Sequence, residues 1–161
     1  MKTDFISRFL EKILAIMWVV VFILFIGTTG YIIYDLIRDF NVYILVFGII
    51  NICANFFILY TITELRKILK RVLDKKPFVR SNVTSFKRIG FSSFGIAALI
   101  LIRLIIDIKG SDPFDMFFLN ASAMNYKGGF LMFLIFGCLA LVLSEIFRLA
   151  VEIKEENDLT V

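Results

Sequence analysis

Apolar residues along this chain gather into four long runs, near residues 13–34, 42–62, 89–106 and 130–144. An α-helix rises about 1.5 Å per residue, so a run of about 20 residues matches the hydrocarbon core of a bilayer, which is about 30 Å thick. With the less apolar residues at their ends, the runs predict four membrane-spanning helices near residues 13–34, 42–62, 86–108 and 127–147. We therefore predict an all-α fold: an integral membrane four-helix bundle that forms a single domain over residues 1–161.

The first run could instead be a cleaved signal peptide, because charged residues precede it and small residues occur at positions 27–30. However, its apolar part continues through Tyr31, Ile32 and Ile33, which makes it longer than the apolar core of a usual signal peptide. No Ala-x-Ala-like cleavage site follows it. We expect an uncleaved first helix.

The segment between the second and third runs, residues 63–85, carries the pattern of an amphipathic helix. From Thr63 to Lys76 apolar residues recur at the spacing of one helix face, and basic residues occupy the other positions. We expect a separate helix on the cytoplasmic membrane surface, ended by Pro77, and a third helix with Ser81 or Asn82 as its N-cap. The bases are Arg66, Lys67, Lys70, Arg71, Lys75 and Lys76, and the apolar residues are Leu65, Ile68, Leu69, Val72 and Leu73.

Two interpretations of this basic helix stay open. It can anchor the chain to anionic lipid headgroups, since each base near such a surface contributes about 1 kcal/mol. It can also be a docking surface for a cytoplasmic protein, with Leu65, Ile68 and Val72 as an exposed apolar edge.

The tail, residues 148–161, is mostly acidic. Residues Ser144 to Glu156 keep a helical pattern and should prolong the fourth helix, with Glu145 and Arg148 spaced to pair at i, i+3. Because the tail and the basic helix leave the membrane on the same side, we expect the acidic residues to lie against the basic helix. These acidic residues are Glu152, Glu155 and Glu156.

Polar residues inside the predicted spans need partners, because an unpaired polar group in hydrocarbon is costly. Asn51 and Asn55 lie one turn apart in the second span and should hydrogen-bond to another helix, with a substrate path as the alternative. Arg103 and Asp107 are spaced to pair at i, i+4 near the outer end of the third span.

Small residues predict where helix backbones approach closely, and they therefore mark the interior of the bundle. Gly48 in the second span is isolated and is a weaker signal. The main sets are residues 27–30 of the first span, Ser93, Gly95, Ala97 and Ala98 of the third, and Gly137, Ala140 and Ser144 of the fourth.

Composition agrees with a membrane protein, since 60% of the residues are hydrophobic and the mean hydropathy is +0.89. The chain has no histidine, which excludes histidine-based catalysis, metal binding and pH sensing. Its two cysteines, Cys53 and Cys138, fall inside predicted spans, where we expect packing residues and no disulfide framework. We predict no catalytic residue, no cofactor and no metal site.

Basic residues concentrate on one side of the predicted membrane. Three precede the first span and seven lie in residues 63–85, whereas the opposite side has three bases accompanied by five aspartates. The positive-inside rule then places both termini and the 63–85 loop in the cytoplasm of a multi-pass protein of the cell membrane. The net charge of +4 follows from this topology, so direct nucleic-acid binding is not needed to explain it.

The chain resembles an uncharacterised family of small four-helix bacterial membrane proteins, a domain of unknown function. The resemblance lies in residues 75–82, the amphipathic helix before them, residues 86–90 and the ending 155–161. Family members are often encoded beside a short helix-turn-helix regulator. The resemblance therefore implies such a regulator as a cytoplasmic partner. It brings no catalytic residues with it.

Together these observations favour a non-enzymatic regulatory or accessory membrane protein that presents its basic helix and acidic tail to a cytoplasmic partner such as a transcription regulator. The bilayer with its anionic headgroups is the other expected partner, and a homo-oligomer is an open alternative. A small transporter or efflux subunit would need a membrane-embedded carboxylate, and no acidic residue lies centrally in a predicted span. An immunity protein against a membrane-active peptide fits the size and charge only.

Overall fold

The computed structural model describes the backbone of residues 2–107 and 121–159, and the side chains of residues 8–106 and 128–158. The described backbone forms four α-helices and no strand, which confirms the all-α fold. The helices are α1 (Lys2–Arg38), α2 (Val42–Leu73), α3 (Arg80–Asp107) and α4 (Ala121–Leu159). Short connections join the first three: α2 begins at the N-cap Asn41, whose side chain accepts a hydrogen bond from the Tyr43 backbone N–H at 2.9 Å.

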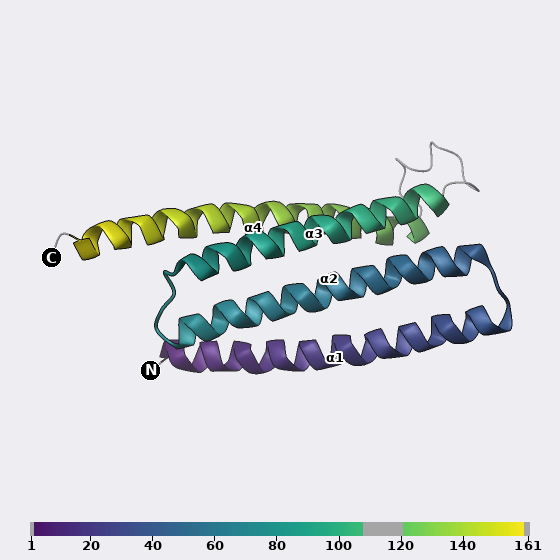
Figure 1. Ribbon diagram of the computed structural model, residues 1–161, viewed down its shortest axis with the longest axis horizontal. Helices are drawn as coiled ribbons and strands as arrows, with labels where there is room; N and C mark the ends of the chain where they lie inside the picture. Colours follow the sequence, from purple (N-terminus) through teal and green to yellow (C-terminus); the bar gives the residue numbers. More distant parts are fainter. Residues whose placement is uncertain (1, 108–120, 160–161) are drawn as a thin grey trace.

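The helices run alternately up and down along one long axis (Figure 1). This places the start of α1, the α2–α3 connection and the end of α4 at the same end of the molecule. We call this end, formed by residues 63–88 and 145–158, the charged end. This confirms the prediction that these segments lie at the same end of the molecule.

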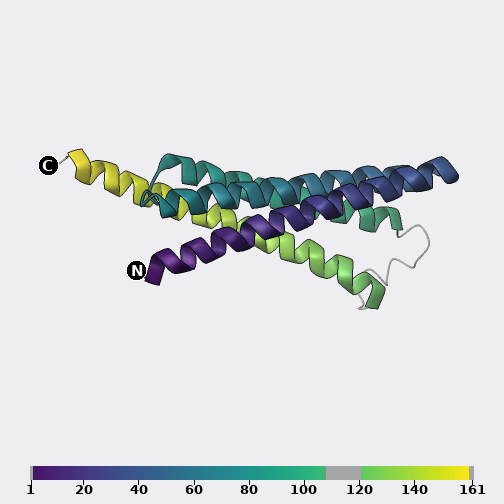
Figure 2. The same cartoon turned by 90° about the horizontal axis from the view of Figure 1, so that it is seen from below.

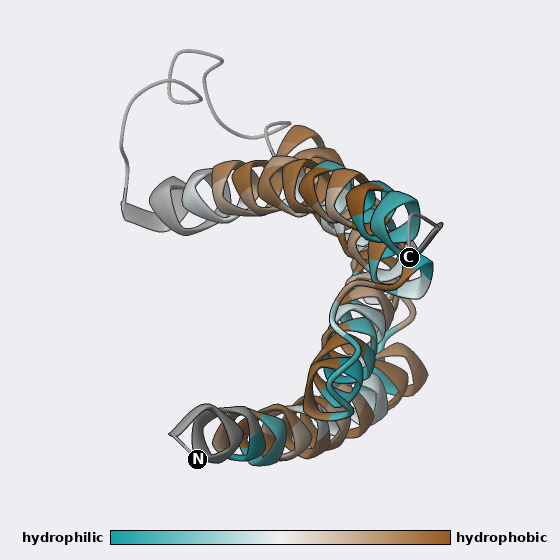
Figure 3. Cartoon of the chain, turned by 90° about the vertical axis from the view of Figure 1, so that its left-hand side faces the viewer, coloured by the Kyte–Doolittle hydropathy of each residue, from teal (hydrophilic) through white to brown (hydrophobic). Residues whose placement is uncertain are grey.

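Seen along the axis, the helices form an open arc with α1 and α4 at its two ends (Figure 3). Packing follows chain order, with α2 against α1, α3 against α2 and α4 against α3. Figure 2 shows α1 and α4 tilting in opposite directions. The four-helix arrangement is thus open, because neighbouring helices pack as pairs and the outer two do not close a ring.

All four helices are long and apolar enough to cross a membrane. Their most apolar stretches are largely uncovered by protein, with none of that stretch buried in α1 and only 6% of it in α2. Apolar surface of this extent is not stable in water, so the helices require a lipid environment. At 37 residues α1 is about 55 Å long, which exceeds the hydrocarbon core of about 30 Å.

The predicted surface helix over residues 63–76 is a continuation of α2. The pattern was amphipathic, but its apolar face is covered by α3: Ile68 is buried in a core cluster with Ile89 and Ala140, and Leu65 and Phe86 pack against it. The predicted separate helix on the membrane surface is therefore wrong. Of its predicted exposed edge, Ile68 is buried, Leu65 is partly buried and Val72 alone is exposed. Only residues 74–79 remain as a connection between helices.

Helix α2 ends before Pro77, through a Schellman motif at Lys75. Lys75 has a left-handed backbone with φ of 56°. Its N–H donates to the Val72 carbonyl and the Lys76 N–H donates to the Arg71 carbonyl, both at 3.0 Å, which is the paired pattern of this motif. Glycine usually occupies this position, so a lysine here costs local strain. The structure thus corrects the predicted end of the helix at Pro77.

Small residues bring α3 and α4 together, as predicted. A Cβ atom on Gly137 would lie 2.8 Å from the Phe94 ring and 3.2 Å from the Gly90 carbonyl oxygen, so the two backbones meet at these glycines. Gly48, the weaker signal, is just as close, because its Cβ would lie 2.7 Å from Ile32 of α1. By contrast, Cβ atoms at Gly27 and Gly30 would meet no other residue. The prediction for that pair is wrong.

Candidate functional site

Glu64 is the most deeply buried charged residue of the charged end. It lies on the face of α2 that packs against α3, and its residue surface is fully covered. Oε1 of Glu64 accepts a hydrogen bond from the Lys67 ammonium at 2.7 Å and lies 3.5 Å from Nη1 of Arg88 on α3. A buried carboxylate is tolerable when cations compensate its charge, so these two bases stabilise the ionised form.

A second buried group, Asn82, closes the α2–α3 connection. Its side-chain amide donates to the Pro77 carbonyl at 2.7 Å, and its Oδ1 accepts from Nη1 of Arg71 at 2.9 Å. The same Arg71 nitrogen also donates to the Ser85 hydroxyl at 3.0 Å and to the Ser81 carbonyl at 3.3 Å. One arginine of α2 and one asparagine of α3 therefore hold the connection from both sides. We call Arg71, Asn82 and the Pro77 carbonyl the clamp.

Polar contacts also join α3 to α4. The Ser144 hydroxyl, fully buried, donates to the Val83 carbonyl at 2.9 Å. Nearer the end of α4, the Arg80 guanidinium forms a two-point pair with Glu155, at 2.6 and 3.0 Å. The Phe86 and Phe147 rings also pack together at a tilt of 37°, with their centroids 4.9 Å apart. Hydrogen bonds, ion pairs and side-chain packing thus connect α2, α3 and α4 at the charged end.

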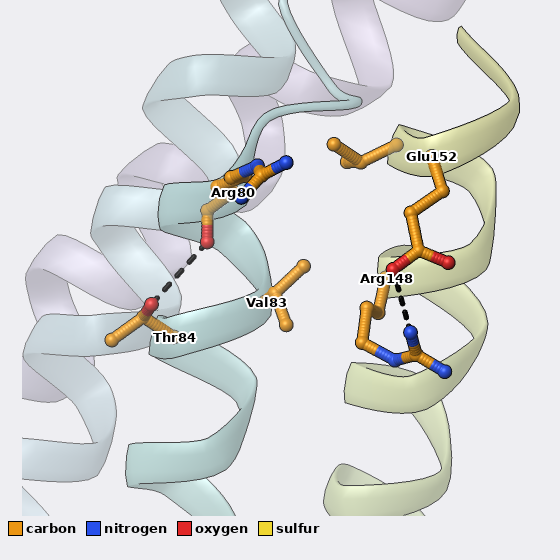
Figure 4. Close-up of a pocket in the computed structure, with 6 residues that line it drawn as sticks. Arg80, Val83, Thr84, Arg148 and Glu152 are labelled. Carbon is orange, nitrogen blue, oxygen red and sulfur yellow. Dashed lines mark hydrogen bonds and ion pairs between the residues drawn. The ribbon is translucent and has the colours of Figure 1, made fainter. Parts of the chain in front are cut away.

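A small pocket of about 240 Å³ lies between the start of α3 and the end of α4 (Figure 4). Its polar groups are already engaged: Arg148 donates to Glu152 at 2.6 Å, and the Thr84 hydroxyl donates to the Arg80 carbonyl at 3.3 Å. Two of its lining residues, Val83 and Val151, are apolar and buried. The pocket is therefore a gap between paired side chains more than a set of groups aimed at a ligand.

The structure divides the predicted basic surface into two groups. Lys67 and Arg71 donate to the buried side chains of Glu64 and Asn82, respectively. In the described part of the chain the remaining four form no ion pair or side-chain hydrogen bond. We call these four the free basic patch: Arg66, Lys70, Lys75 and Lys76.

The acidic tail is part of α4, as predicted, but it meets different bases from those expected. Glu155 pairs with Arg80 at the start of α3, and Glu152 pairs with Arg148 one turn earlier on its own helix. The predicted pair between Glu145 and Arg148 is confirmed. Glu156 is exposed. Because α4 packs on α3, contact of Glu152 and Glu155 with the basic segment of α2 is replaced by these pairs.

Asn51 and Asn55, within the apolar region, differ from expectation in their partners. The Asn55 amide donates to both the carbonyl and the side-chain oxygen of Asn51, at 2.9 and 2.8 Å, so the pair is satisfied along α2 itself. The predicted bond to another helix is wrong here. Arg103 lies over the Phe47 ring of α2 at 5.3 Å from its centroid, a cation–π contact. The Asp107 side chain lies outside the described residues.

Sequence reasoning missed Glu64 and gave Asn82 the wrong role. A signal for the first existed: Glu64, Ile68 and Arg71 are spaced i, i+4, i+7 and so share one helix face with a buried isoleucine. Charged residues on an apolar face are expected to be paired. Asn82 offered no comparable signal, because an N-cap asparagine and a buried one look alike in sequence.

Metal and thiol chemistry find no support in the described residues. Within them no three His, Cys, Asp or Glu side chains gather closely enough to hold a metal ion. Cys53 and Cys138 are free thiols, the second of them exposed on α4.

Four long apolar helices, joined by polar contacts at one charged end, define the class: a multi-pass α-helical membrane protein. Residues 33–161 match the profile of the family described as "Protein of unknown function (DUF2975)". The chain belongs to this family, as the resemblance in the α2–α3 connection indicated. No curated protein and no solved structure matched the chain.

Proposed function

We propose that this chain is a non-enzymatic accessory or regulatory membrane protein that binds an acidic surface of a cytoplasmic protein through its free basic patch. The observation that carries the proposal is the division of the bases at the charged end. Lys67, Arg71 and Arg88 neutralise or hold buried groups, whereas the free basic patch is left for an external partner. Complementary charge of this kind increases the association rate and selects partners.

The proposed topology places the charged end in the cytoplasm of the cell membrane. The distribution of bases supports this, because the opposite end carries few of them. We predict that in intact cells an impermeant thiol reagent labels Asp39→Cys, in the exposed α1–α2 connection, and spares Ser81→Cys, in a background without Cys53 and Cys138. Labelling of the second variant alone would reverse the orientation.

The partner proposed is a helix-turn-helix regulator encoded beside this chain, as the family resemblance implies. The full-length protein in nanodiscs of zwitterionic lipid would be titrated with that regulator. Reversal of Arg66, Lys70 and Lys76 to glutamate should weaken binding strongly, and the wild-type affinity should fall steeply as salt is raised. Arg71 is left unchanged because its loss would open the clamp.

The matched control reverses a base of the same end outside the patch, Lys154→Glu, and should leave binding unchanged. Equal binding by the triple variant and the wild type would contradict the proposal. If the triple variant bound the regulator more weakly than the wild type only in nanodiscs without anionic lipid, headgroups would occupy the patch in an anionic membrane, which is the lipid-anchor interpretation of these bases.

The transporter alternative is weakened by the surroundings of Glu64. This carboxylate is buried, but its Oε1 is held by Lys67 and Arg88. Exchange of protons with a cationic substrate requires a carboxylate that a substrate can reach. The two pairs favour a structural role for Glu64.

A further inference from the structure

The outer face of α4 carries an uncovered apolar seam with the spacing of a coiled coil. Its members alternate by three and four residues along the helix, which is the a/d pattern of a heptad repeat. Each of them is about half exposed or more, from 48% at Leu149 to 67% at Met132. The seam consists of Met132, Ile135, Leu139 and Val142 in the apolar half of α4, and Ile146, Leu149 and Ile153 in the charged half.

The seam lies opposite the face that packs on α3. The α3 side of α4 is formed by Gly137, Ala140, Ser144 and Val151, all of them buried. Residues of the seam are offset from these by about half a turn, so α3 does not cover them. The neighbouring helices therefore leave this face of α4 available along its length.

The charged half of the seam is the informative part. Seven charged residues lie between Glu145 and Asp158, so this stretch does not sit in hydrocarbon. In the apolar half lipid chains can cover the exposed face, and Ile146 lies at the boundary of the predicted span, but lipid chains cannot cover Leu149 and Ile153. Large apolar side chains that continue the heptad spacing beyond the lipid indicate a helix that packs against another helix.

We propose that the occupant is α4 of a second copy of this chain, in a parallel two-stranded coiled coil. Copies inserted in the same membrane with the same orientation have parallel α4 helices. Isoleucine at the a positions Ile146 and Ile153 with leucine at the d position Leu149 is the combination that favours two parallel strands. A two-fold pairing also buries the same residues on both copies.

The flanking positions agree with this pairing. In a parallel dimer each g residue faces the e residue of the next heptad on the partner helix. Glu145 then faces Ala150, and Glu152 faces Asn157, so no like charges oppose each other. The seam spans 22 residues, about 33 Å at 1.5 Å per residue, and continues from the charged half into the apolar half without a break.

Disulfide trapping in native membranes tests the proposal with the full-length chain. Cys53 and Cys138 are replaced by alanine, and single cysteines are introduced as Ile146→Cys, Leu149→Cys or Lys154→Cys. We expect oxidation to link two chains through the first two positions, because facing a and d residues bring their Cβ atoms close enough for a disulfide. Lys154, exposed on the same helix but off the seam, should remain unlinked.

A second measurement follows the oligomeric state in mild detergent by light scattering. The wild-type chain is expected at twice the 18.6 kDa of one copy, and Leu149→Glu at the mass of one copy. Lys154→Glu, which also introduces a glutamate but away from the seam, should remain a dimer. Equal cross-linking at all three positions, a wild-type chain at single-copy mass, or one copy bound to a different protein would overturn the proposal.

Discussion

Asn82 supplies the sharpest test of how the charged end is held together. Its side chain is fully buried and makes two hydrogen bonds: the amide donates to the Pro77 carbonyl, and the Oδ1 atom accepts from Arg71. Asn82→Ala removes both bonds and leaves the backbone of α3 unchanged. Arg71 keeps its bonds to Ser85 and Ser81, so the substitution loosens the connection without stranding the guanidinium.

The magnitude follows from the types of bond. A hydrogen bond to a neutral carbonyl contributes about 1 kcal/mol, and one to a charged donor about 1.5 to 3 kcal/mol. Asn82→Ala should therefore lower the free energy of unfolding by about 3 kcal/mol. If only the connection opens, its open population should rise about a hundredfold, since about 1.4 kcal/mol corresponds to a factor of ten.

Two assays separate global from local effects. Trp18 is the single tryptophan of the chain, and its indole N–H donates to Thr63 of α2 at 3.2 Å, so its fluorescence during a denaturing-detergent titration reports loss of α1–α2 packing. Trypsin cleavage after Lys75, measured under native conditions, reports opening of the connection, because cleavage follows the open population.

Ser81→Ala is the matched control, because the Ser81 side chain is exposed and should change stability by less than about 0.5 kcal/mol. A double-mutant cycle of Asn82→Ala with Arg71→Met should give a coupling energy of about 1 to 3 kcal/mol. Asn82→Ala that unfolds and is cleaved like the wild type would refute the clamp.

Two further substitutions test backbone geometry. Lys75→Gly should stabilise the protein by about 0.5 to 1 kcal/mol in the same titration, because glycine relieves the left-handed conformation, whereas Lys76→Gly should give no gain. Gly137→Ala should destabilise it by about 1 to 3 kcal/mol, because the added methyl group meets Phe94; Gly27→Ala, where nothing lies within 4 Å, should be neutral or mildly stabilising. A larger gain from Lys76→Gly than from Lys75→Gly would show that the left-handed backbone is not a source of strain. A larger loss from Gly27→Ala than from Gly137→Ala would show that the contact with Phe94 does not limit the packing of α4 on α3.

The helices could be predicted from the sequence because four apolar runs of spanning length leave few other structures. The arrangement of the helices could not. Residues 63–76 show why. Helical spacing identifies which side of a helix is apolar, but it does not show whether lipid, a partner protein or a neighbouring helix covers that side. Only the α2–α3 contact through Ile68 and Ile89 distinguishes them.

The site was less predictable for a related reason. Net charge and its distribution are readable from sequence, so the predicted basic surface includes the four residues of the free basic patch. Which bases are engaged depends on the face of α2 that meets α3, and this separates Arg71 from Lys70 although they are adjacent. The predicted small residues mark close approaches at Gly48 and Gly137, and they mark none at Gly27 and Gly30 of α1.

The position of Lys67 has a consequence for how the chain is made. Residues emerge from the ribosome in order at about 5 to 20 per second, so Arg88, 24 residues beyond Glu64, appears about 1 to 5 s later. Throughout that interval α3 is not available to the carboxylate. Lys67 lies three residues from Glu64 on the same helix, so the charge on α2 is compensated as soon as its last turns form. The carboxylate is therefore paired within its own helix before α3 is present to cover it.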